Sequence, residues 1–344
     1  MLTVTDLNLS YPPKTVLNRF SLHVEADEII CLLGQSGCGK TTALRTIAGF
    51  EQPENGSIAF NGQTLFDSHT YIPAHKREIG MVFQDYALFP HLSAAENIAF
   101  GLQKSGKEAK QKRIKEMLAL IDMTDYANRY PHQLSGGQQQ RIALARALAP
   151  SPKLILLDEP FSNLDADLRT RLSKDIRHML KQTHTAAILV THDRQEAFTM
   201  ADKVGMMVEG RLKQFDTPRQ IYHAPADEYI ASFCDAGSII SGRIVSPMQI
   251  GTALGIIDLT APCSYPAGQS IKILLRNNNI VHNPQAAVQA TVAEQNFRGC
   301  HTVYTLQLDN GETVALETDS FQNFPIGTRL PVQVRPENLV LFPA

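Results

Sequence analysis

Apolar and polar residues follow different periods along the chain, and each period predicts an element. Near the start they alternate in places, as around Leu7 and Leu9, which is typical of half-buried strands. Ile29–Leu33 is a short run without polar residues and predicts a buried strand, while Thr41–Ala48 predicts a helix that ends at Gly49. A buried strand, a glycine-rich turn and a helix in this order are typical of the opening of a parallel α/β domain.

The middle of the chain adds a hairpin, a helical region and a strand–helix–strand unit. Ile58–Phe60 and Thr64–Phe66 flank an Asn-Gly pair, which predicts a β-hairpin. From about residue 93 to residue 149 the apolar spacing is helical. Its basic part, residues 104–115, is more typical of a solvated helix face than of a binding patch. Two buried parallel strands with a helix between them complete the region: Leu154–Leu157, Asp165–Lys181 and Ala186–Thr191.

Helical periodicity disappears after about residue 235. Short apolar runs follow, separated by Gly, Pro and Asn, and this pattern predicts a small all-β barrel. A weak internal echo, Arg-x-x-Asn followed by Ile or Leu, begins at Arg276 and again at Arg335, each time after an apolar strand. The predicted strands are Arg243–Val245, Ile271–Leu275, Val288–Val292, Val303–Leu308, Thr313–Leu316, Leu330–Val334 and Leu339–Phe342.

The composition narrows the class of protein. The 344 residues suggest two domains, and the net charge of −2 shows no basic excess that would point to nucleic acid. The start lacks the pattern of a signal peptide, and no apolar run approaches the ~20 residues needed to span a bilayer. Five cysteines without a CxxC pair favour a reducing, cytoplasmic compartment: Cys31, Cys38, Cys234, Cys263 and Cys300. We therefore expect any role at a membrane to come through a partner.

The turn after Ile29–Leu33 fits the pattern G-x-x-x-x-G-K-[ST]. Glycines let the backbone wrap phosphate groups without Cβ clashes, and the N–H groups of the following helix meet the negative charge. Lys40 should reach the β- and γ-phosphates of ATP, and the Thr41 hydroxyl should bind Mg²⁺. A chance glycine turn is the alternative, and the flanking strand and helix argue against it. The predicted contacts are Gly34, Gln35, Ser36, Gly37, Cys38, Gly39, Lys40, Thr41 and Thr42.

The apolar strand Leu154–Leu157 is followed by two acids, Asp158 and Glu159. Alone the pattern is weak, because helix capping or plain surface charge would also account for it. Downstream of a phosphate-binding loop it predicts a catalytic pair. Asp158 at the strand end can hold Mg²⁺ directly or through water, and Glu159 is placed to orient or deprotonate the attacking water.

The segment Leu134–Gln138, with the sequence LSGGQ, supplies a second helix N-terminus. Ser135 is a good N-cap, so an ordinary capped helix is one interpretation. Two glycines at a helix N-terminus also make an anion site, and one chain does not need two such sites for one ATP. Two chains head to tail do, since each supplies this loop to the nucleotide of the other. The sequence here resembles the ABC ATPase family, whose signature is this pentapeptide, and the predicted contacts are Ser135, Gly136, Gly137 and Gln138.

The resemblance implies roles for four further residues. Tyr11 resembles the aromatic residue that stacks on adenine, although an exposed tyrosine at a strand end is an equal alternative. Gln84 matches the glutamine that senses Mg²⁺ and water and links to the permease. Asp165 matches the loop that crosses the dimer, in a segment where the family more often has alanine in place of Asn163. His192, directly after Ala186–Thr191, matches the histidine that contacts the γ-phosphate and is a catalytic candidate with Glu159, Gln84 and Lys40.

The resemblance covers residues 1–235 and includes the ordered motifs of the family. It implies an α/β fold, with a P-loop ABC ATPase core that has an antiparallel β subdomain and a helical subdomain at about residues 86–150. Residues 236–344 resemble the OB-like accessory domain of importer ATPases that serve sugars, polyamines, sulfate or ferric iron. The Val334–Glu337 run and the repeated Arg-x-x-Asn pattern support that second match.

The implied function is an ABC importer ATPase that works as a homodimer on the cytoplasmic face of the plasma membrane. A nucleic-acid-associated ABC ATPase would usually carry two cassettes in one chain or a long coiled coil, and an exporter would often carry fused membrane helices. A P-loop kinase needs neither Leu134–Gln138 nor His192. The implied partners are an integral-membrane permease that docks near Gln84 to Phe100 and an extracytoplasmic solute-binding protein. Residues Ile79–His91 resemble those of the ferric-iron importers, and sugar, sulfate and polyamine importers share much of that stretch.

Overall fold

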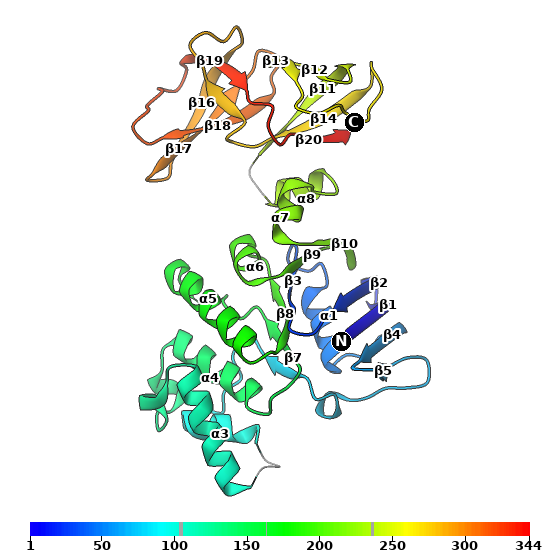
Figure 1. Ribbon diagram of the computed structural model, residues 1–344, viewed down its shortest axis with the longest axis vertical. Helices are drawn as coiled ribbons and strands as arrows, with labels where there is room; N and C mark the ends of the chain where they lie inside the picture. The colour runs from blue at the N-terminus through cyan, green and yellow to red at the C-terminus, as the bar shows by residue number, and fades with distance from the viewer. Residues whose placement is uncertain (103–105, 163, 235–236) are drawn as a thin grey trace. The chain divides into compact units, whose positions relative to one another are not determined.

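A computed structural model describes residues 1–102, 106–162, 164–234 and 237–344. Two compact units make up the chain, Met1–Pro218 and Arg219–Ala344 (Figure 1). None of the helices in the described ranges is long and apolar enough to cross a membrane.

A six-stranded sheet organises the first unit, in the order β10-β9-β3-β8-β7-β6. The strands from β6 to β9 are parallel, and β10 pairs with β9 in the antiparallel sense. Every residue of β3, β7 and β8 is buried, which explains why these strands read as unbroken apolar runs. Parallel strands end at the same edge, so the residues that follow β3, β7 and β8 are brought together. The six strands are β3 (Ile29–Leu33), β6 (Gly80–Val82), β7 (Leu154–Asp158), β8 (Ala186–Thr191), β9 (Lys203–Val208) and β10 (Arg211–Asp216).

A four-stranded antiparallel sheet lies beside α1 (Lys40–Ala48), in the order β2-β1-β4-β5. Its apolar residues share one hydrophobic core with β3, α1, β7 and β8. The predicted hairpin is confirmed: Asn61 and Gly62 join β4 to β5 with φ of 50° and 80°, the left-handed pair that a tight two-residue turn requires. The strands are β1 (Leu2–Tyr11), β2 (Lys14–Val24), β4 (Asn55–Phe60) and β5 (Gln63–Phe66).

The helices of this unit follow the sequence pattern closely. The predicted C-cap of α1 is confirmed, because Gly49 has a φ of 86° and its N–H bonds the last carbonyls of the helix. The amphipathic helix between β7 and β8 is α5 (Ala166–Gln182), capped by the Asp165 side chain. The others are α2 (Ala94–Phe100), α3 (Lys107–Leu120), α4 (Gly136–Leu148) and α6 (Arg194–Met200), with short 3₁₀ turns η1 (Ala74–Lys76), η2 (Thr124–Tyr126) and η3 (Pro131–Gln133).

The second unit is all-β after two short helices, α7 (Pro218–His223) and α8 (Glu228–Cys234), which confirms the predicted class of its tail. Two five-stranded antiparallel sheets, β13-β12-β11-β14-β20 and β15-β19-β16-β17-β18, bury one common apolar core. Three short strands, β12, β13 and β15, are absent from the sequence prediction. The strands are β11 (Ser238–Ser246), β12 (Gln249–Thr252), β13 (Gly255–Asp258), β14 (Ser270–Leu275), β15 (Ile280–His282), β16 (Gln289–Phe297), β17 (His301–Gln307), β18 (Thr313–Asp319), β19 (Arg329–Val334) and β20 (Val340–Pro343).

Candidate active site

The loop between β3 and α1 is shaped by close backbone contacts. A Cβ on Gly34 would lie 2.4 Å from the carbonyl oxygen of Met207, and Gly39 combines a φ of 107° with a Cβ position 2.6 Å from the carbonyl oxygen of Val16. Only glycine fits either position without displacing backbone. The loop therefore folds tightly over the N-terminus of α1, whose N–H groups form an anion site.

Lys40 points back into this loop and is only 5% exposed. Its Nζ atom donates hydrogen bonds to the carbonyl oxygens of Gly34 at 2.8 Å and Gln35 at 2.9 Å. Of the predicted phosphate contacts beside it, Gln35, Ser36 and Gly37 are exposed at the mouth of the loop. The arrangement gathers positive charge and backbone donors around a space suited to phosphate oxygens.

Thr41 and Asp158 join α1 to the end of β7. The Thr41 hydroxyl donates a hydrogen bond of 2.9 Å to Oδ1 of Asp158, across 117 positions of sequence. Asp158 is 4% exposed, and burial raises the pKa of its carboxyl although the hydrogen bond from Thr41 opposes the change. A buried carboxylate beside a hydroxyl is a set of hard oxygen ligands, which fits a magnesium ion.

Glu159 turns sharply out of β7. Its φ is 44°, and its N–H donates to the carbonyl oxygen of Val190 at 3.1 Å. Oε2 of Glu159 lies 3.5 Å from Nδ1 of His192, which follows β8. The sharp turn thus places the carboxylate at the sheet edge, facing the histidine of the neighbouring strand.

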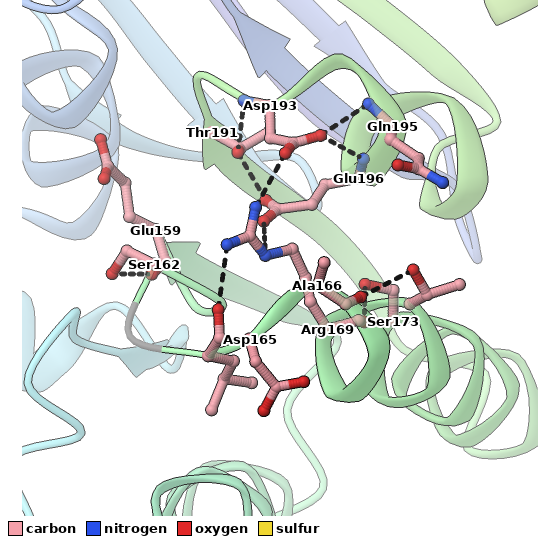
Figure 2. Close-up of polar contacts among 12 residues, drawn as sticks. Glu159, Ser162, Asp165, Ala166, Arg169, Ser173, Thr191, Asp193, Gln195 and Glu196 are labelled. Carbon is pink, nitrogen blue, oxygen red and sulfur yellow. Dashed lines mark hydrogen bonds and ion pairs between the residues drawn. The ribbon is translucent and has the colours of Figure 1, made fainter. Parts of the chain in front are cut away.

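Ser162 connects this pair to the predicted glutamine. The hydroxyl of Ser162 donates to the carbonyl oxygen of Glu159 at 3.1 Å and accepts from Nε2 of Gln84 at 3.4 Å. Figure 2 shows Glu159 and Ser162 on the turn that leads from β7 toward α5. The structure therefore brings Gln84, Glu159 and His192 to one edge of the sheet. Thr41 and Asp158 lie at the same edge.

The LSGGQ segment begins α4 with the predicted N-cap. Ser135 Oγ accepts from the N–H of Gln138 at 3.4 Å, and Oε1 of Gln138 accepts from the N–H of Ser135 at 2.9 Å. A Cβ on Gly137 would lie 3.2 Å from the side chain of Leu168, so the loop packs against the first turn of α5. Asp165 caps that same turn by accepting from the N–H of Leu168 at 2.9 Å. Ser135–Gln138 and Asp165 thus form a second group, built on the start of α5.

Tyr11 ends β1 and is 45% exposed. Burial of the rest of the side chain and a hydrogen bond with Glu51 raise the pKa of the phenol. Its exposed ring suits a planar partner and equally suits a strand end in solvent. Asn163, the position at which the chain departs from the family pattern, lies outside the described residues.

Sequence reasoning missed a charged cluster next to this site. Arg169 on α5 is placed between Asp193 and Glu196, which flank the start of α6 (Figure 2). Glu196 is 5% exposed, and burial raises the pKa of its carboxyl. The sequence feature that could have indicated this cluster is the run of polar residues directly after His192, which begins a helix with a buried face.

Comparisons with known proteins agree with the motifs. Residues 17–162 match the family model described as ABC transporter, and residues 273–342 match that of the TOBE domain. The chain is 42% identical over 342 residues to the "Fe(3+) ions import ATP-binding protein FbpC 2" of Pectobacterium atrosepticum, covering 97% of both chains. It is 39% identical to the protein of the same name from Haemophilus influenzae, over 98% of this chain and 96% of that one. The "Spermidine/putrescine import ATP-binding protein PotA" of Ruegeria pomeroyi is 37% identical over 93% and 90% of the two chains.

Two solved structures each resemble 64% of the chain. A dimeric ATP-binding cassette in a post-hydrolysis state, bound to ADP and Pi, has a TM-score of 0.56 and 28% identity, over 64% of this chain and 99% of that one. The cbiO1 protein from Clostridium perfringens, part of the ABC transporter complex cbiONQ, has a TM-score of 0.59 and 29% identity, over 64% and 89%. With near full-length relatives at this identity, the chain belongs to the ABC transporter ATP-binding proteins and is an ATP-binding ATPase.

Proposed function

We propose that this ATPase drives the import of ferric iron through a separate integral-membrane permease. The observation that supports the solute is the near full-length identity, 42% and 39%, to two proteins whose names specify import of Fe(3+) ions. Identity that extends over both units points to the same kind of transporter subunit rather than to a shared nucleotide-binding unit alone. We further propose that the chain lies at the cytoplasmic face of the membrane, where the permease holds it.

The loop between β3 and α1 would bind the phosphates of the nucleotide. Phosphate oxygens would replace the carbonyl oxygens of Gly34 and Gln35 as partners of the Lys40 ammonium, which already lies inside the loop. The N–H groups of residues 34–42 would surround the remaining oxygens. Tyr11 would supply its exposed ring to the adenine base.

Thr41, Asp158 and Gln84 would hold Mg²⁺, since Thr41 and Asp158 already share a hydrogen bond and Gln84 lies at the same sheet edge. Held there, the ion would supply positive charge against the phosphate oxygens. The pKa of Asp158 is raised by burial, so the carboxylate gains from a cationic partner.

Hydrolysis requires a water in line with the bond that breaks between the γ-phosphorus and the β-phosphate oxygen. Glu159 accepts the proton of that water at its carboxylate, and the Gln84 amide orients the water. The imidazole of His192, 3.5 Å from the Glu159 carboxylate, would donate to a γ-phosphate oxygen. ADP and phosphate are the products.

The complete site needs two chains. Ser135–Gln138 packs against the start of α5, as the contact of Gly137 with Leu168 indicates. In a head-to-tail homodimer the N-terminus of α4 from one chain would meet the γ-phosphate held by the other. Asp165, on the same surface, would cross to the partner.

The permease would dock on the surface near Gln84 to Phe100. Phe100 is 47% exposed and its ring packs on Phe89 with centroids 4.4 Å apart. The segment therefore offers an ordered apolar surface, linked by chain to Gln84. An extracytoplasmic binding protein would deliver the solute to the permease.

A polyamine is the second candidate solute, because a relative named for spermidine and putrescine import is 37% identical over 335 residues. The deciding experiment reconstitutes the chain with its permease in vesicles and measures ATPase activity with iron-loaded and with empty binding protein. We expect stimulation by the iron-loaded form only, with Glu159→Gln as the inactive control. Stimulation by a spermidine-loaded binding protein instead would reassign the solute and leave the ATPase mechanism in place.

A further inference from the structure

Arg169 connects three segments that surround the γ-phosphate end of the proposed site (Figure 2). Its Nη1 donates to Oδ2 of Asp193 at 2.8 Å and its Nη2 donates to the carbonyl oxygen of Leu164 at 3.0 Å. The third nitrogen, Nε, lies 3.5 Å from Oε1 of Glu196. One guanidinium on α5 thus holds the loop before α5 and the start of α6 at the same time, which its fork of donors allows.

The two residues on either side of His192 are both fixed by this cluster. The Thr191 hydroxyl donates to Oε2 of Glu196 at 2.5 Å and accepts from the N–H of Asp193 at 3.0 Å. Asp193 also caps α6, because its Oδ1 accepts from the N–H of Gln195 at 2.7 Å. Hydrogen bonds therefore hold the backbone on both sides of His192, although the imidazole itself is 55% exposed.

The other end of the connection is the loop that carries Asp165. Leu164, whose carbonyl accepts from Arg169, immediately precedes Asp165, and the N–H of Arg169 donates to the carbonyl oxygen of Asp165 at 2.9 Å. Asp165 is exposed and next to Ser135–Gln138 on the surface proposed to meet the second chain. A shift of this loop would thus act directly on the guanidinium.

We propose that Arg169 is a positioning residue for ATP hydrolysis, which fixes the strand end carrying His192 to the loop carrying Asp165 so that the two segments move as one. This inference rests on the roles proposed above for His192 and Asp165. It gives the chain a direct link between the surface that faces its partner and the group that contacts the γ-phosphate. Arg169 would act through these two segments rather than through a contact of its own with the nucleotide.

The same helix supplies a matched control. Two turns later, Arg177 makes an ion pair of 2.7 Å with Asp202 and donates to the carbonyl oxygen of Met200. Its side chain is 33% exposed and that of Arg169 is 27% exposed. Both arginines hydrogen-bond to one carboxylate and one backbone carbonyl, whereas only Arg169 has a second carboxylate, Glu196, 3.5 Å from its Nε and only Arg169 adjoins His192.

The experiment compares Arg169→Met with Arg177→Met in the full-length chain, with His192→Ala in parallel. Steady-state ATPase kinetics are measured at a temperature well below the Tm of every variant. We expect a similar fall in Tm for both methionine variants, because each loses a comparable ion pair. We expect kcat to fall about 10- to 100-fold for Arg169→Met alone, with KM for ATP nearly unchanged, since small misplacements of reacting groups cost about that much.

Arg169→Lys keeps the charge but replaces the planar fork, whose two ends reach Asp193 and the carbonyl oxygen of Leu164, with a single nitrogen, so its kcat should lie between those of the wild type and Arg169→Met. It also serves if Arg169→Met fails to fold. Wild-type kcat in both Arg169 variants, together with a low kcat in His192→Ala, would overturn this inference and leave the proposed site standing. An unchanged kcat in His192→Ala would overturn it through its premise and would remove His192 from the proposed mechanism as well.

Discussion

Both units place polar residues directly after buried strands, yet the two sets do different work. In the first unit β7 is followed by Glu159 and β8 by His192, whose side chains are 23% and 55% exposed at the sheet edge. In the second unit β14 is followed by Arg276 and Asn279, which are 6% and 5% exposed. The side chains of the first pair are open to solvent, whereas those of the second pair are nearly buried and hydrogen-bond to the backbone of their own unit.

Asn279 shows what the repeated Arg-x-x-Asn pattern does. Its Oδ1 accepts from the N–H of Arg276 at 2.8 Å, and its Nδ2 donates to the carbonyl oxygens of Arg335 at 3.1 Å and Glu337 at 2.8 Å. One side chain thus locks the end of β14 to the end of β19. Asn338, at the matching position, has a φ of 57° and serves the turn. A polar residue after a strand therefore predicts chemistry only where its hydrogen-bonding groups are not consumed by the turn.

The largest effect should come from Glu159→Gln, which tests the catalytic half of this comparison. The substitution preserves size and removes the carboxylate proposed as the base, so ATP should still bind while kcat falls by about 100-fold or more. Steady-state ATPase and nucleotide-binding assays measure the two properties, and the ATP-bound closed dimer should accumulate. Full turnover in this variant would remove Glu159 from the mechanism.

A mixing experiment tests whether the two groups of the first unit belong to one composite site. Homodimers of Lys40→Ala and of Ser135→Arg should both be inactive. In a mixed dimer one composite site carries both substitutions and the other carries neither, so ATPase activity should partly return. Activity of isolated monomers at high dilution would contradict shared sites, and each variant measured alone is the control.

Asn279→Ala tests the structural half. Loss of its amide leaves the buried N–H of Arg276 without its acceptor, which should lower the free energy of unfolding of the second unit by about 1–3 kcal/mol. ATPase activity should stay near that of the wild type, as read in parallel with urea denaturation. The neighbouring exposed Asn278→Ala is the control and should change neither property. If Asn279→Ala loses kcat without losing stability, Asn279 is not a purely structural residue and the comparison of the two units fails.

The smallest effect concerns Asp202, a carboxylate of the first unit that is remote from the sheet edge. Burial would raise its pKa, but hydrogen bonds from Lys181, the N–H of Ile29 and Arg177 outweigh burial and hold the pKa below 3.8. Its contribution to stability is therefore complete above pH 3.8 and is lost as pH falls through the lowered pKa. Asp202→Asn should lower the Tm near pH 7, and the difference from the wild type should shrink toward pH 3.

Local patterns predicted the fold well where one element carries its own signal. Unbroken apolar runs predicted β3, β7 and β8, and the Asn-Gly pair predicted the turn between β4 and β5. The strands β12 and β13 escaped prediction because each has four residues and contains a glycine, which weakens any strand signal. β15 has only three residues and owes its pairing to β19.

The residues of the candidate site were likewise predicted only where each follows from a local pattern. Lys40, Asp158 and His192 each follow a predicted strand or open a predicted helix, so the sequence places them at one sheet edge. The polar run after His192 indicates charged residues at the start of α6 but not what they contact, because Arg169 and Asp193 are 24 positions apart and meet only through the packing of α5 on α6. Periodicity gives the buried face of a helix and does not name the partner of a charged residue at its border.

Glu159 has a further consequence for anyone who would engineer this chain. A side chain at a φ of 44° lies in the left-handed region, where a non-glycine residue costs about 1–2 kcal/mol. A protein selected in the laboratory for thermal tolerance alone would gain by replacing Glu159 with glycine, and the survivor would be a stable protein that no longer turns over. Screens for hardier variants of this ATPase therefore need a turnover assay at every round, because one of the positions where glycine would relieve backbone strain is the proposed base.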